Sequence, residues 1–247
     1  MNIDHEQQQF RTSKPSRLGR GIERLTHPFG KALSAVVPKS LVEAVLKGLD
    51  RTVGAAQLVR FDHDVYDIEA ANRAAKTVSR TAQSISASTG AAAGLGGAVS
   101  MSADIPATIA IALRTIRDTG RAFGFEGAGA NEKLFRLQIL ELAALDDPDL
   151  RTQRIADLEN AIGPDGTLIE ADHETITPII DQAVERVSRA VAFASFRKRA
   201  GMIVPIVGSL VGGVVNSSFQ KDVGKAARFA FQTRRRRSQG ADQPVPA

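Results

Sequence analysis

The stretch GAAAGLGGAVSMSADIPA, residues 90–107, decides which folds are open to this chain. It holds four glycines, one charged residue and four large apolar side chains. Gly90 and Gly94 stand four residues apart, so on a helix they form a flat strip that a second backbone can approach closely. Gly97 adds a further small position. Because a helical glycine costs about 1 kcal/mol relative to alanine, we expect these glycines to serve close packing or a conformational change.

A second stretch has the same composition. Residues 200–220 read AGMIVPIVGSLVGGVVNSSFQ and carry no charge, as do residues 81–103 around the first stretch. The four-residue glycine spacing returns at Gly208 and Gly212, between Pro205 and Asn216. The sequence therefore predicts two glycine-rich helical segments that pack closely against neighbouring helices.

Each uncharged run is long enough to cross a bilayer, which takes about 20 mostly apolar residues. The first run has only four large apolar side chains and is followed by Asp104. An ionised carboxylate in the bilayer core costs about 2.5–3.5 kcal/mol, so this run favours a packed helical hairpin. The second run has ten large apolar residues. For residues 201–219, insertion into the membrane and packing inside the protein therefore stay open as alternatives.

The triplet Asp104-Ile105-Pro106 ends the first stretch. An aspartate accepts hydrogen bonds from the first turn of a following helix, and proline fits early in a helix, where its missing N–H leaves no bond unmade. The triplet thus predicts that a well-capped helix begins at Asp104. The alternative is that Asp104 is a buried functional carboxylate.

Almost every other segment has the apolar spacing of a helix, and no segment alternates as a half-buried strand does. We therefore predict an all-α fold: one multi-helix domain over residues 26–233, with a flexible basic arm at 1–25 and a disordered Arg-rich tail at 234–247. Polar residues and one proline mark the expected helix starts. They are Ser40 with Glu43, Asp67, Asn131, Asp149, and Thr177 with Pro178.

The net charge of +5 is concentrated at the two ends. Residues 1–39 carry a net +4 and residues 220–247 a net +5, whereas the middle carries −4. The run Arg234–Arg237 follows the most apolar segment, so we expect these four side chains to contact anionic lipid, at about 1 kcal/mol each near a charged surface. A solvated tail without a partner is one alternative, and nucleic-acid binding by the same tail is another. Nucleic-acid binding is the weaker reading because the chain has one tyrosine and no tryptophan for stacking on bases.

Signals for catalysis, cofactors and metals are missing. There is no cysteine, which excludes disulfides, thiolate nucleophiles and cysteine zinc sites. The four histidines are widely spaced, and no phosphate loop or dinucleotide fingerprint is present. The segment FDHDVYD, residues 61–67, predicts a polar loop and helix cap rather than a metal site. We therefore predict no cofactor, no metal ion and no catalytic set.

Two separated blocks resemble the EcsC family. They are GAAAGLGGAVSMSADIPATIAIALRTIRDTGRAFGF with the following NEKLFRLQILELAAL, and IVPIVGSLVGGVVNSSFQKDVGKAARFAF. The shared positions are Ala103–Pro106, Gly124–Phe125, Pro205–Gly208, Asn216 and Gly224–Arg228, and the likeness covers roughly residues 40–232. The resemblance implies a bacterial, helical protein of a family named from an operon that encodes an ABC transporter. It implies no enzymatic activity and supplies no catalytic residue.

Three hypotheses follow. The first is a non-enzymatic protein at the cytoplasmic face of the membrane, bound to anionic lipid or to a membrane protein through the glycine-rich helices and the basic C-terminus. The polar N-terminus, which lacks the apolar core of a secretory signal, fits that location. The second is a hydrolase-type enzyme that uses Asp104 in a helical pocket. The third is nucleic-acid binding by the arginine tail.

Overall fold

The computed structural model describes residues 2–12, 39–95, 97–145, 147–170, 173–200 and 208–241. Within these ranges it describes only the backbone at 39–41, 51–53, 89–95, 97–106, 173–175, 191–200, 208–216 and 241. The helices are α1 (Ile3–Thr12), α3 (Lys39–Gly54), α4 (Ile68–Leu95), α5 (Gly97–Ala122), α6 (Ala130–Ala144), α7 (Pro148–Asn160), α8 (His173–Ala200) and α9 (Gly208–Ala241). The β-structure in the described ranges is one isolated bridge between Ile162 and Leu168. The predicted all-α class is confirmed.

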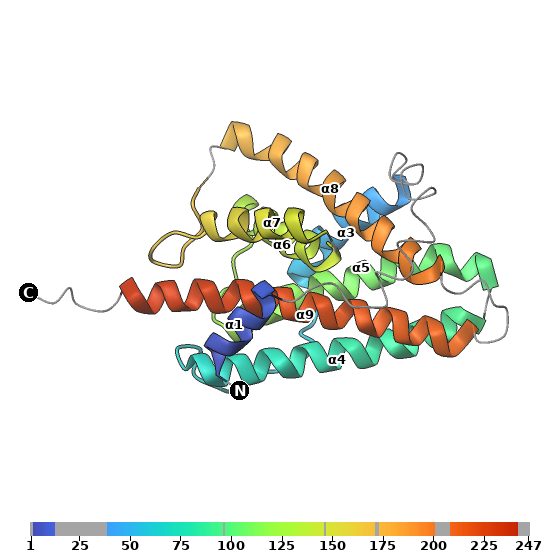
Figure 1. Ribbon diagram of the computed structural model, residues 1–247, viewed down its shortest axis with the longest axis horizontal. Coiled ribbons are helices and arrows are strands. Elements are labelled where there is room, and N and C mark those ends of the chain that lie inside the picture. Colours follow the sequence, from blue (N-terminus) through green and yellow to red (C-terminus); the bar gives the residue numbers. More distant parts are fainter. Residues whose placement is uncertain are drawn as a thin grey trace, which may run out of the picture.

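Three long helices, α4, α5 and α9, pack together and form the body of the molecule (Figure 1). Helix α9 lies along α4 and also contacts α5 and α6. Helix α3 packs on α5 and α8, and α8 packs on α6, so these elements cover one side of the body. The short helix α1 lies against α9.

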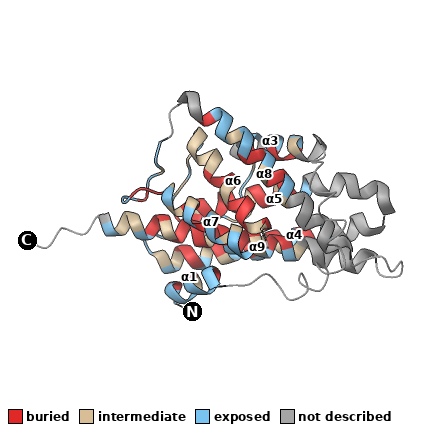
Figure 2. Cartoon of the chain, turned by 45° about the horizontal axis from the view of Figure 1, so that its top comes forward, coloured by how far each residue is buried: buried red, intermediate tan, exposed pale blue. Residues whose placement is uncertain are grey.

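The core is centred where α5, α6 and α9 meet (Figure 2). Phe231 of α9 lies between two aromatic rings, with its centroid 6.1 Å from that of Phe125 and 5.7 Å from that of Phe135. Phe123 and Phe229 are also buried. A ring edge that meets a ring face contributes about 0.5–1.5 kcal/mol beyond the burial of its area. This aromatic cluster therefore fixes how the ends of α5 and α6 sit on α9.

Small residues allow the long helices to approach closely. A Cβ atom built on Gly224 of α9 would lie 2.7 Å from Cβ of Ser79 on α4, closer than real Cβ atoms come. A Cβ atom on Gly120 of α5 would lie 2.8 Å from the ring of Phe231. Close packing of helices through glycine is thus present at Gly224, a motif position named above. The glycines for which it was predicted, Gly90, Gly94, Gly208 and Gly212, lie where only the backbone is described, so for them it stays a prediction.

Two predicted helix starts bear on how the first stretch folds. Asp67 caps α4 as predicted, because its Oδ1 accepts hydrogen bonds from the backbone N–H groups of Glu69 at 2.9 Å and Ala70 at 3.0 Å. Asp104 does not start a helix: α5 begins at Gly97, so Asp104 and Pro106 lie inside it and the predicted cap is wrong. Packing against α4 and α9 outweighs the weak helix propensity of the glycine run.

Other starts shift by a few residues. Helix α7 is capped by Asp147 with Pro148 in its first turn, two residues before the predicted Asp149. Asn131 is the second residue of α6, whose N-cap is Gly129 without a side-chain hydrogen bond. Helix α8 begins at His173, so Pro178 lies inside it and Thr177 is not its cap.

The predicted boundaries also shift at both ends of the chain. Residues 3–12, predicted as part of a flexible arm, form α1, because Ile3, Gln7 and Phe10 are buried on one side of it. Residues 234–241, predicted as disordered, continue α9. The remaining parts of the predicted arm and tail, 13–25 and 242–247, lie outside the described residues. No helix in the described part of the chain is both long enough and apolar enough to cross a membrane.

Candidate functional site

The glycine-rich motif positions gather at one end of the molecule. Gly90 and Gly94 lie near the end of α4, and Gly97 starts α5, as Gly208 starts α9. Figure 1 shows these three helix ends side by side, far from α1 and from the C-terminal end of α9. We call this the glycine-rich end, made of residues 89–106 and 208–216. The fold thus brings together two runs that are more than 100 residues apart in the sequence.

Several predicted motif residues lie at this end without described side chains. Gly212 and Asn216 are in the first turns of α9, and Asp104 and Pro106 are in α5. Pro205 lies outside the described residues. The hypothesis that Asp104 is a functional carboxylate therefore stays a prediction.

The arginine quartet, Arg234–Arg237, is placed differently from the prediction. Arg234 is buried. Its Nε donates a hydrogen bond to the carbonyl of Gly166 at 3.1 Å, and its Nη1 donates to the Glu132 carboxylate at 2.9 Å. Its guanidinium carbon lies 4.1 Å from the ring centroid of Phe125. Burial lowers the pKa of the Arg234 guanidinium, and Glu132 partly offsets this shift. Arg234 thus makes its contacts inside the protein, with the start of α6 and the loop after α7.

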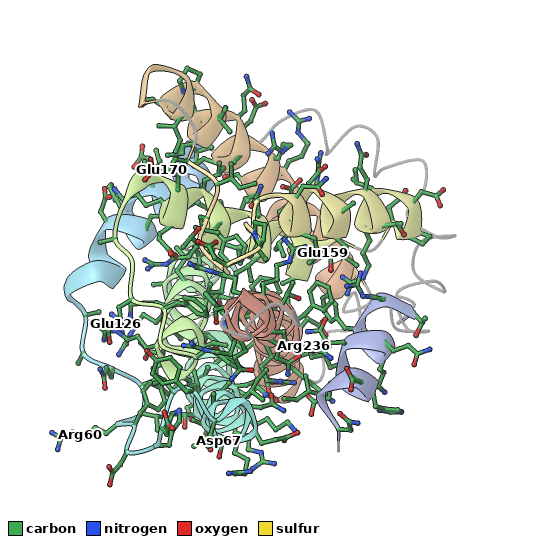
Figure 3. The ribbon with its side chains drawn as sticks, turned by 90° about the vertical axis from the view of Figure 1, so that its left-hand side faces the viewer. Arg60, Asp67, Glu126, Glu159, Glu170 and Arg236 are labelled. Atoms are coloured by element: carbon green, nitrogen blue, oxygen red, sulfur yellow. The ribbon has the colours of Figure 1, made fainter. Side chains whose placement is uncertain are left out.

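The other three arginines extend this pattern. Arg235 is buried and donates to the carbonyl of Phe123, and Arg237 donates to the carbonyls of Glu159 and Ile162. Arg236 is about half exposed and pairs with Asp4 of α1 (Figure 3). The quartet therefore ties α1 and the loops before α6 and after α7 to α9, and Arg234 and Arg235 are not placed to face a lipid surface.

Motif residue Arg228 belongs to a polar cluster between α1, α4 and α9. Its centre is Glu6 of α1, which pairs with Lys76 of α4 and accepts a hydrogen bond from Nδ2 of Asn72 at 3.3 Å. Gln232 of α9 donates to Asn72 Oδ1 at 2.9 Å and to Glu6 Oε2 at 3.4 Å. Burial alone would raise the pKa of Glu6, but Lys76, Asn72 and Arg228 together hold it below its ordinary value of 4.5.

A cavity of about 170 Å³ opens beside this cluster. Its lining comes from α1 and α9 and combines charged, amide and aromatic side chains. The lining residues are Glu6, Gln9, Phe10, Lys225, Arg228, Phe229 and Gln232. Because Phe10 stacks on Phe229 with ring centroids 4.6 Å apart, one wall of the cavity is apolar.

A second, more open cavity of about 400 Å³ lies between the start of α6 and the loop at residues 163–170. Two of its three acidic side chains are engaged locally: Glu132 pairs with Arg234, and Asp165 accepts hydrogen bonds from Thr167, whereas Glu170 is exposed. No three histidine, aspartate or glutamate side chains in the described ranges are grouped to hold a metal ion. This cavity therefore offers no clear chemistry.

The predicted polar loop at residues 61–67 is confirmed. Asp64 Oδ1 accepts a hydrogen bond from the backbone N–H of Tyr66 at 2.8 Å, and His63 Nε2 lies 2.8 Å from the carbonyl oxygen of Ala122. With the Asp67 cap, these contacts fasten the loop to the end of α5.

Sequence reasoning missed the buried pair Arg117–Asp118 on α5. Arg117 Nε donates to Asp118 Oδ1 at 2.7 Å, and both side chains are at most 3% exposed. Arg117 also donates to the carbonyl of Ala55 at 2.7 Å, and Asp118 accepts from the backbone N–H of Leu58 at 2.6 Å. The pair thus holds the segment after α3 on α5. Two adjacent charges inside the apolar run of α5 were the available signal.

The fold and these clusters define a class of protein, an all-α body of three long helices packed through small residues and tied together by buried arginines. The model of the EcsC protein family matches residues 2–235, and the chain belongs to this family. It is 23% identical to "Protein EcsC" of Bacillus subtilis (strain 168) over 223 residues, which are 90% of this chain and 88% of that protein. It is 25% identical over 153 residues to "Uncharacterized protein YdbA" of the same organism, 59% of this chain and 51% of that protein. No solved structure matches.

Proposed function

We propose that this protein works at the cytoplasmic face of the membrane, without an enzymatic activity of its own, and that its glycine-rich end makes the contact with the lipid surface or with a membrane protein. The observation that carries the proposal is the meeting of the two uncharged runs at one end of the molecule (Figure 1). An end built largely from small residues, with Asp104 as its one charged residue, has little charge to desolvate and lets another surface approach its backbone closely.

The arginine quartet has a different role in this proposal from the one that its sequence suggests. Because Arg234 and Arg235 are buried and bonded to other parts of the protein, they support the fold rather than the membrane contact. Nucleic-acid binding by the same residues is disfavoured for the same reason. Membrane association should then depend on the glycine-rich end and depend only weakly on salt.

Fractionation of the native protein with high-salt and carbonate washes tests this proposal, together with flotation on phosphatidylglycerol vesicles. Leu95→Glu with Val99→Glu places one charge at the end of α4 and one in the first turn of α5. Ile169→Glu is the matched control, because Ile169 is a 60% exposed apolar residue on the loop after α7. We expect the double variant to lose membrane association while Ile169→Glu keeps it.

Two results would contradict the proposal. The wild-type protein could stay entirely in the supernatant in both assays. Alternatively, the double variant could bind membranes as the wild type does, and rising salt concentration could release both proteins. That result would mean that exposed basic residues make the membrane contact.

A further inference from the structure

Arg228 is a largely buried cation without adequate hydrogen-bond partners. Its Nε atom is sequestered from solvent and makes no hydrogen bond to any described residue. The carboxylate that approaches this nitrogen is that of Glu6, with Oε2 at 3.8 Å, which is beyond hydrogen-bond distance. Leaving a buried charged donor unsatisfied costs more free energy than leaving a neutral donor unsatisfied. The structure therefore presents a donor that fits an added acceptor.

Glu6 cannot pair fully with Arg228, because both of its carboxylate oxygens already accept hydrogen bonds from other groups. Lys76 pairs with Glu6 Oε1, which also accepts from Asn72, and Gln232 donates to Oε2. The positive charge of Lys76 largely cancels the negative charge of Glu6. Arg228 is thus left with positive charge that no described carboxylate neutralises at hydrogen-bond distance.

Two more side chains with hydrogen-bond donors line the same cavity. Lys225 lies three residues before Arg228 on α9, so both project from the same side of the helix. Gln9 of α1 adds an amide. Both side chains are exposed, and neither has a hydrogen bond or ion pair with another described residue. Guanidinium, ammonium and amide donors that converge on one cavity are a set that suits phosphate oxygens.

The size of the cavity is suitable for a polyatomic anion. Its volume of about 170 Å³ is more than ten times the roughly 10–15 Å³ that one water molecule needs by the same measure. The stacked rings of Phe10 and Phe229 form an apolar wall. A bound molecule could therefore place a charged group against Arg228 and a small apolar part against the rings.

We propose that the cavity between α1 and α9 binds a small soluble anion through a phosphate group, held by Arg228 and Lys225 with help from Gln9. The same chemistry would suit a phospholipid headgroup. Arg228, however, lies 12 residues along α9 from Asn216, the last residue of the glycine-rich end, which is about 18 Å at the rise of a helix. The site therefore functions independently of the proposed membrane contact.

Isothermal titration of the full-length protein with inorganic phosphate at constant ionic strength tests the proposal, with chloride as the competing anion. We expect saturable binding that chloride does not reproduce. Arg228→Gln and Lys225→Gln should each weaken it about tenfold, as expected for the loss of one charge-assisted hydrogen bond. Lys225 is exposed, so its variant keeps the test valid if Arg228→Gln does not fold.

Lys221→Gln is the matched control, because Lys221 is an exposed lysine one turn earlier on α9 that does not line the cavity. It should bind phosphate as the wild type does. The proposal is overturned if phosphate gives no saturable heat, if the Lys221 and Lys225 variants lose the same affinity, or if Lys225 affects binding to phosphatidylglycerol vesicles while free phosphate does not bind.

Discussion

Gly224 shows how a single missing Cβ atom sets the distance between two helices. Added at Gly224, this atom would lie 2.7 Å from Ser79 Cβ and closer still to Ser79 Oγ. The hydroxyl can rotate away, but Cβ moves only with the backbone of α4. Gly224→Ala should therefore lower the free energy of unfolding by about 1–3 kcal/mol, as overpacking does, measured by urea denaturation.

Gly240 is the matched control for this substitution, because it lies on the same helix with nothing within 4 Å of its added Cβ. Gly240→Ala should leave stability unchanged or raise it by no more than about 1 kcal/mol. Adding Ser79→Gly to Gly224→Ala should restore part of the loss. Equal stability of the two alanine variants would show that α4 and α9 do not approach as closely as described.

The buried Arg117–Asp118 pair predicts a larger loss. Asp118→Asn would leave the Arg117 guanidinium, 3% exposed, without its carboxylate. Removing one partner of a buried pair costs about 3–5 kcal/mol, because the remaining charge stays buried. Asp50→Asn is the comparison, since Asp50 is 71% exposed in its pair with Lys133 and should cost at most about 1 kcal/mol. Similar urea midpoints for the two variants would argue against burial of the first pair.

At the scale of an element, α1 is held to the body by Glu6, whose lowered pKa makes this attachment depend on pH. Ionised Glu6 is favoured in the folded protein, so its contribution to stability is present above its ordinary pKa of 4.5 and is lost as the pH falls through the lowered value. The difference in unfolding free energy between the wild type and Glu6→Gln should therefore be full at pH 6–7 and shrink below pH 4.5.

Urea titrations of both proteins between pH 3 and 7 measure this difference. All other carboxylates are common to the two proteins, so their titration cancels and the remaining pH dependence belongs to Glu6. A difference that stays constant from pH 7 to pH 3 would mean that Glu6 does not act as an ionised partner of Lys76.

The sequence predicted the helices better than it predicted where they begin. Asp67 caps α4 because its side chain is free to bond the first turn, and that local chemistry is readable from the sequence. Asp104 has the same local chemistry but lies inside α5, because contacts with α4 and α9 extend α5 back to Gly97. Contacts between segments that are distant in the sequence decide where such a helix begins. These contacts cannot be inferred from a single sequence.

The candidate sites also differ in how far the sequence could predict them. The glycine-rich runs and Arg228 could be found from spacing and from the family resemblance. The cavity beside Arg228 could not, because Glu6 and Phe10 come from a segment that looked too polar to fold. Its helix has only three buried residues, Ile3, Gln7 and Phe10, and its partners on α9 lie more than 200 residues away.

At the scale of the whole molecule, the arginine quartet joins segments that would otherwise be separate. Its members donate to carbonyls at Phe123, Glu159, Ile162 and Gly166 and pair with Asp4 and Glu132. A chain that ends at Thr233 would lose all of these contacts. Since a hydrogen bond to a charged group contributes about 1.5–3 kcal/mol, we expect this truncation to lower the free energy of unfolding by at least about 3 kcal/mol.

A chain that ends at Ala241 is the control, because it keeps α9 whole and should match the full-length protein in thermal melts. The two truncations separate a structural role from a surface role. If the quartet only contacted lipid, the shorter chain would melt at the same temperature and lose vesicle binding. If the quartet holds the fold, the shorter chain should melt at a lower temperature, and its remaining folded fraction should still bind through the glycine-rich end.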